Sequence, residues 1–141
     1  ILPTLAGMSG CPLPCDVHGA DLGPVLADGA APWRELFYAQ CMESPRQSAM
    51  VTDGRWKYIY SQEGPTEELY DRAADPHELS DLARRADGDD LGRPWRERLI
   101  AEARRLGDAG LLDDAGDLVR SQVDRDAIAK LPVAGMGWRW W

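Results

Sequence analysis

The clearest hydrophobic pattern lies in the middle of the chain, where short apolar and aromatic runs are separated by turn residues. The runs cover residues 36–42, 49–52 and 55–60, and Asp53-Gly54 joins the second run to the third. An Asp-Gly pair supplies the positive φ angles of a tight hairpin turn, so these runs predict antiparallel strands. Residues 68–71 predict a short fourth strand. The sequence therefore predicts an antiparallel sheet of three to four strands.

Aromatic side chains alternate along the run 55–60. Trp56, Tyr58 and Tyr60 share one side of the predicted strand, because successive side chains of a strand point to opposite faces. Such a stripe most often forms core beneath a helix, and less often forms a platform on which sugars stack. We favour the core, because the amphipathic pattern at 94–106 predicts a helix that needs a surface to cover.

Helical patterns occupy both ends of the sequence. Glycines and prolines end the first of them, and an Asp-Pro pair at 75–76 opens a later one. We expect helices at residues 1–9, 21–26, 75–83, 94–106 and 111–129, the last weakened by Gly116. The tail 135–141 is broken by glycine and rich in tryptophan. The predicted fold class is α+β, a small antiparallel sheet packed by C-terminal helices.

The chain is acidic, and the acidity is concentrated. The net charge is −8, and residues 62–91 hold ten acidic and three basic side chains, which contribute −7 of it. A phosphate backbone or an anionic membrane surface would be repelled, so nucleic acid and such membranes are excluded as partners. No apolar run approaches the roughly 20 residues that a membrane-spanning helix requires. We therefore predict no membrane association.

The sequence starts at Ile1, without an initiator methionine or a basic stretch, so we expect it to be a segment of a longer protein. Three cysteines are an odd number and exclude a fully paired disulfide framework within the chain. The compartment stays open, with reduced thiols, as in the cytoplasm, favoured.

Several side chains have the chemistry of a metal or catalytic site, but a simpler interpretation is favoured for each. The soft ligands Cys11, Cys15, His18 and Cys41 lack the second closely spaced pair of a structural zinc site. His77 has no nucleophile or paired carboxylate placed near it by the sequence, so a solvent-side position is favoured over a catalytic base. The aspartate pairs at 89–90 and 113–114 are typical of solvated loop charges rather than metal sites.

Two stretches of the sequence resemble the C-terminal region of sulfatases, enzymes of the alkaline-phosphatase-like superfamily. The opening 2–22 resembles the family's segment D-L-x-P-T-L followed by D-G-x-S-L-x-P-L-L, although His18 stands where aspartate is usual. Residues 50–60, 68–71 and 74–83 resemble the family's patterns R-x-G-x-x-K-Y-I, E-L-Y-D and D-P-x-E-x-x-N-L-A. The resemblance covers most of residues 1–83.

The resemblance implies a domain organisation and a division of chemistry. Residues 1–35 would be the end of the N-terminal sulfatase domain with its connecting loop, and 36–141 the C-terminal subdomain. In the family, a formylglycine made from Cys or Ser in C/S-x-P-x-R attacks the sulfate ester beside a divalent cation such as Ca²⁺. That motif is absent from this sequence. We therefore assign no catalytic, cofactor-binding or metal-ligating residue to the chain. We expect the formylglycine and the divalent cation in its parent protein.

The connection between the first two predicted strands is the best candidate for contact with substrate. In the family that the sequence resembles, this connection can lie near the mouth of the active-site cleft, so Arg46 and Gln47 are candidate substrate-rim residues. The simpler interpretation, a surface loop without contact to substrate, is favoured. Lys57 matches no lysine motif of a sulfatase active site, and we expect its stem to cover apolar surface while its ammonium reaches solvent or a carboxylate.

The resemblance also implies partners and leaves alternatives. The partners would be the N-terminal catalytic region of the same protein and a sulfated small molecule or glycan. A phosphodiesterase or phosphonate hydrolase of the same superfamily is the first alternative to a sulfatase. A stand-alone domain that binds a partner protein through its acidic stretch or aromatic tail is the second.

Overall fold

A computed structural model describes residues 1–13, 15–42, 46–63 and 66–120. The chain divides into two compact units, Ile1–Glu35 and Leu36–Trp141. Among the described residues, none of the helices is long and apolar enough to cross a membrane.

The first unit consists of two short helices and a loop. Helix α1 covers Leu2–Ser9 and ends at Gly10, whose φ of 68° is the left-handed conformation typical of a helix C-terminus. Helix α2 covers Gly23–Ala27. The buried Thr4 links them, because its Oγ1 accepts a hydrogen bond of 3.0 Å from the amide of Leu22. Both helices predicted for this part of the sequence are confirmed.

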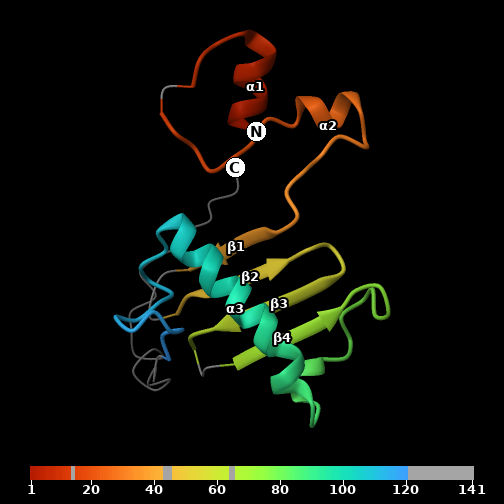
Figure 1. The fold of residues 1–141 in the computed structure, drawn as a ribbon, viewed down its shortest axis with the longest axis vertical. Coiled ribbons are helices and arrows are strands. Elements are labelled where there is room, and N and C mark those ends of the chain that lie inside the picture. The colour runs from red at the N-terminus through yellow and green to blue at the C-terminus, as the bar shows by residue number, and fades with distance from the viewer. Residues whose placement is uncertain (14, 43–45, 64–65, 121–141) are drawn as a thin grey trace, which may run out of the picture. The chain divides into compact units, whose positions relative to one another are not determined.

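The second unit is built on a four-stranded antiparallel sheet with the order β1-β2-β3-β4 (Figure 1). The strands are β1 (Phe37–Cys41), β2 (Ser48–Thr52), β3 (Trp56–Ser61) and β4 (Thr66–Asp71). Each strand pairs with its neighbour in sequence, and the hairpin predicted at Asp53-Gly54 joins β2 to β3. The predicted α+β class and antiparallel sheet are confirmed.

One face of the sheet forms the core under helix α3 (Gly88–Leu106), which crosses the strands in Figure 1. The register aligns Tyr38, Val51, Tyr58 and Leu69 in one row across the four strands. Trp95, Leu99 and Ala103 of α3 are buried in the same hydrophobic cluster as Val51, Tyr58, Tyr60 and Leu69. Tyr58 and Tyr60 are 0% and 2% exposed, so the aromatic stripe of β3 is core and not a platform for sugars.

The helix predicted at 75–83 is wrong: the segment forms turns followed by a short 3₁₀ helix, η1 (Leu82–Arg84). Aspartate side chains bind the backbone amides that a helix would use. Asp75 Oδ2 accepts from the Ser80 amide at 2.8 Å, and Asp81 Oδ1 accepts from the amides of Leu69 and Ala83. Asp81 thereby attaches this segment to β4.

The two later helix predictions also need correction. Helix α3 begins at Gly88 rather than at Pro94, which lies inside the helix. Of the helix predicted at 111–129, residues 111–120 instead form a loop closed by a bridge between Leu112 and Leu118. Gly116 adopts a positive φ of 85° there, which interrupts a right-handed helix. Residues 121–129 and the tail 135–141 lie outside the described residues.

We predict that Gly54 is required by its backbone conformation rather than by space. Its φ is +96°, while a Cβ at this position would meet nothing within 4 Å. Gly54→Val should therefore lower the free energy of unfolding by about 1 kcal/mol or more through strain alone. The measurement is thermal or urea unfolding of the purified chain.

Gly92→Ala is the matched control, because Gly92 lies in α3 and its Cβ would meet only Tyr58 at an ordinary 3.9 Å. This substitution should raise the free energy of unfolding by up to about 1 kcal/mol, since alanine favours helix. Equal stability of Gly54→Val and the wild type would contradict the strain argument.

Candidate functional site

Arg46 is the outward-facing side chain of the connection that leads into β2. The side chain is 42% exposed, and its Nε lies 3.4 Å from Glu63 Oε2. An exposed ion pair of this length contributes little to stability, so exchange of Glu63 for an anionic ligand costs little. Arg46 can therefore offer its guanidinium to an anion.

Gln47 has the opposite environment, although it is the next residue along the chain. It is 2% exposed, and its Nε2 donates to Asp108 Oδ2 at 2.6 Å and to Gln40 Oε1 at 3.2 Å. The backbone amide of Gln47 donates to Gln62 Oε1, and its backbone carbonyl accepts from the backbone amide of Gln62 at 3.0 Å. The side chain of Gln47 is thus bonded within the chain, and of the two predicted rim residues Arg46 is the one that faces outward.

Asp108 connects this segment to the end of α3. Its Oδ2 accepts hydrogen bonds from the Tyr38 hydroxyl on β1 and from the Gln47 amide before β2. Burial and the hydrogen bond to Asp108 raise the pKa of Tyr38 well above its usual value, so the phenol keeps its proton and acts as the donor. Asp108 therefore holds together both strands that flank the connection.

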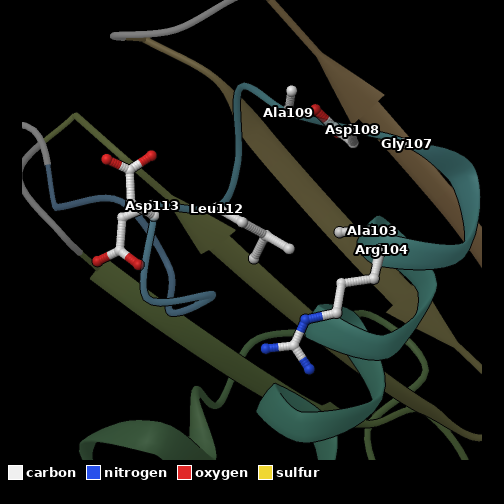
Figure 2. A pocket seen from close by; sticks show the side chains of 8 residues that line it. Ala103, Arg104, Gly107, Asp108, Ala109, Leu112 and Asp113 are labelled. Carbon is white, nitrogen blue, oxygen red and sulfur yellow. The ribbon is translucent and has the colours of Figure 1, made fainter.

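A pocket of about 310 Å³ lies beside Asp108, between the end of α3 and the loop that follows (Figure 2). Its charged lining residues are Arg104, Asp108, Asp113 and Asp114. Arg104 Nη2 already donates to the Gly116 carbonyl at 2.8 Å, and Asp113 Oδ1 accepts from the amides of Ala115 and Asp117. These side chains close the loop, and we assign the pocket no catalytic role.

A second polar cluster connects β4 to α3. The Arg96 guanidinium donates to both carboxylate oxygens of Glu67, with the shortest distance 2.6 Å, and to Asp89 at 2.9 Å. The Tyr58 hydroxyl also donates to Glu67, at 2.8 Å. Burial, and then the bond to Glu67, raise the pKa of Tyr58. The charged groups of this cluster are thus hydrogen-bonded to one another, and the cluster fastens α3 to the sheet.

Lys57 forms an ion pair on the other face of the sheet. Its Nζ lies 2.6 Å from Glu78 Oε2, and Arg72 Nε lies 3.3 Å from Glu78 Oε1. The expectation that the ammonium of Lys57 reaches a carboxylate is confirmed. Glu78 has a positive φ of 55°, so this ion pair holds a turn in an uncommon backbone conformation.

Within each of the two units, the metal and acid–base candidates form no shared site among the described residues. Cys11, Cys15 and Cys41 are exposed thiols, and His77 is exposed in a turn. Within the described ranges, no three or more His, Cys, Asp or Glu side chains form a group that could hold a metal ion. Asp89 and Asp90 instead pair with Arg93 of the next helical turn.

Sequence reasoning missed the residues that hold the rim in place. Gln62 is fully buried, and its Nε2 donates to the Gly110 carbonyl at 2.6 Å. Its position after a strand gives no sign of burial. Asp108 had one available signal, since it follows Gly107, a typical residue at a helix C-terminus.

Three comparisons identify what the chain is similar to. The sequence model of the N-sulphoglucosamine sulphohydrolase C-terminal region matches residues 1–105. A Delta 4,5-hexuronate-2-O-sulfatase of Bacteroides thetaiotaomicron is 29% identical over 131 residues, which are 89% of this chain and 26% of the relative. The chain thus spans about a quarter of the length of that relative.

Solved structures agree in fold. A protein in complex with its substrate, D-glucosamine-2-N,6-O-disulfate, superposes with a TM-score of 0.65 at 25% identity, over 76% of this chain and 24% of that protein. The phosphonate monoester hydrolase of Agrobacterium radiobacter gives a TM-score of 0.58 at 26% identity, over 73% of this chain and 24% of that one.

The family match includes the whole four-stranded sheet and almost all of α3, the elements that form the core of the second unit. It confirms the resemblance to sulfatases of the alkaline-phosphatase-like superfamily. The chain belongs to the N-sulphoglucosamine sulphohydrolase C-terminal family.

Proposed function

We propose that this chain is the C-terminal subdomain of a sulfuric ester hydrolase, in which it completes the fold and forms one side of the substrate cleft. The observation that carries the proposal is the family match over residues 1–105. The matched part of the chain is about a quarter of the length of each of these relatives, which leaves room for a catalytic region in the same polypeptide.

The proposed substrate class is a sulfated sugar. Two similar proteins support it: one is named a hexuronate-2-O-sulfatase and the other was solved with a disulfated glucosamine. Such sugars carry anionic groups besides the ester that is cleaved. Arg46 would bind one of these groups, since a guanidinium pairs with sulfate or carboxylate oxygens through charge-assisted hydrogen bonds.

The reacting groups would come from the catalytic region. The family's formylglycine and divalent cation do not fit this chain, because its sequence has no C/S-x-P-x-R. Among the described residues, no cluster of side chains suits a metal. The proposed roles of this chain are therefore to bind and orient the sugar and to exclude water from one side of the cleft.

A phosphonate or phosphodiester hydrolase of the same superfamily is the alternative. The fold similarity to the phosphonate monoester hydrolase, with a TM-score of 0.58, is the observation that supports it. The protein solved with disulfated glucosamine has the higher TM-score, 0.65. The sulfate group and the phosphonate or phosphate group are all tetrahedral anions. The C-terminal fold alone is therefore compatible with either kind of ester.

A test of substrate preference distinguishes the two hydrolases and shows which part of the protein carries the chemistry. The purified 141-residue chain should hydrolyse no aryl sulfate, with or without Ca²⁺. A polypeptide that joins it to its upstream catalytic region should hydrolyse sulfated glucosamine faster than a phosphonate monoester. The measurement is kcat/KM for each substrate.

Faster cleavage of the phosphonate would favour the alternative hydrolase. Turnover by the isolated chain that disappears on substitution of one of its own residues would contradict the proposed division of chemistry.

A further prediction concerns Lys57, whose ion pair with Glu78 is structural. In the full-length polypeptide, Lys57→Met should lower the free energy of unfolding by less than about 1 kcal/mol, because the pair is partly exposed and Arg72 still faces Glu78. The value of kcat/KM of the folded enzyme should stay nearly unchanged.

Lys57→Arg keeps the charge and serves as the control for stability. A hundredfold fall in kcat/KM with an unaltered melting temperature, equivalent to about 2.7 kcal/mol of transition-state binding, would place Lys57 in the active site.

A further inference from the structure

Asp108 stands where electrostatics disfavour a carboxylate. It directly follows Gly107, the residue that ends α3, and its own amide donates to the Ala103 carbonyl at 2.9 Å. Unpaired carbonyls give a helix C-terminus a partial negative charge, so an aspartate there is repelled unless donors surround its side chain.

The donors that offset this repulsion come from β1 and from the residue before β2. The Tyr38 hydroxyl and Gln47 Nε2 meet the same oxygen, Asp108 Oδ2, with the Gln47 bond at 2.6 Å. Charge-assisted hydrogen bonds are stronger than neutral ones, and this one forms at a glutamine that is only 2% exposed. The carboxylate therefore fixes the side-chain position of Gln47.

Fixing Gln47 also fixes the backbone next to Arg46. The main chain of Gln47 is held on its other side by Gln62, through hydrogen bonds at its amide and its carbonyl. Gln62 in turn donates to the Gly110 carbonyl, two residues after Asp108. Two separate links thus join the chain after α3 to the residue that follows Arg46.

From this arrangement we propose that Asp108 is a positioning residue, which acts through Gln47 and Tyr38 to hold Arg46 at the substrate rim. The inference rests on the proposed function, in which Arg46 binds an anionic group of a sulfated sugar away from the cleaved ester. Asp108 makes no contact with the sugar. Its role is to set the direction of the Arg46 guanidinium, and thereby to favour sugars whose second anionic group lies at one position.

The experiment is a double-mutant cycle in the full-length polypeptide with D-glucosamine-2-N,6-O-disulfate as substrate. Arg46→Ala should raise KM by about tenfold and leave kcat within about twofold, since it removes uniform binding. Asp108→Ala should raise KM in the same direction. The KM of the double variant should be no higher than that of the single variant with the higher KM, because both substitutions remove the same interaction.

Three variants act as controls. Tyr38→Phe removes one donor to Asp108 and preserves the packing of the ring, so it should give a smaller rise in KM. Asp108→Asn keeps an acceptor and should recover most of the affinity. Asp114→Asn changes an exposed aspartate of the same loop and should leave KM and kcat unchanged.

Multiplicative effects of Arg46→Ala and Asp108→Ala on KM would overturn the proposal, as would a fall in kcat that follows the melting temperature. A second measurement needs no activity. Amide hydrogen exchange at residues 46–48 of the 141-residue chain should accelerate in Asp108→Ala and stay unchanged in Asp114→Asn.

Unchanged exchange in Asp108→Ala would overturn the positioning role. Lack of hydrolysis by the wild-type polypeptide would instead overturn the proposed function and leave the exchange result to decide the role of Asp108.

Discussion

The structure of the second unit depends on the packing of α3 against the aromatic face of the sheet. Trp95, Leu99 and Ala103 recur at helical spacing and are buried with Tyr58 and Leu69. Without α3 the apolar face of the sheet would be exposed to water, which is unfavourable, and a helix without tertiary contacts is marginal in water. Each therefore requires the other, and loss of a buried leucine at this contact costs on the order of 2–5 kcal/mol.

Polar contacts fix the orientation of α3 on the sheet. Arg96 binds Glu67 from the middle of α3, and Asp108 binds Tyr38 and Gln47 just after its end. Hydrophobic burial alone tolerates some rotation of a helix over a sheet, whereas hydrogen bonds at two separate points allow little. The position of Gln47, the residue before β2, is consequently determined by the position of α3.

The parts of this fold that follow from short-range patterns could be predicted from the sequence. The hairpin at Asp53-Gly54 and the aromatic alternation of β3 depend on neighbouring residues, and both are present as expected. The segment 75–83 has a helical pattern, but Asp75 and Asp81 bind backbone amides there in a way that periodicity does not reveal. The contacts of Asp108 join residues 61 and 70 positions apart, and no local signal specifies such pairs.

The order of strands has a consequence for how the chain acquires its structure during synthesis. Because β1, β2, β3 and β4 pair in sequence order, each hairpin can form as soon as its second strand has left the ribosome. The cover for their apolar face comes after all four strands, since α3 ends at Leu106 and the core residues Leu111 and Leu118 follow it. From the completion of β4 at Asp71 until α3 docks, Tyr58, Tyr60 and Leu69 face water. The nascent sheet is therefore a surface that chaperones can bind, and its exposure lasts for the synthesis of the segment between β4 and the end of α3.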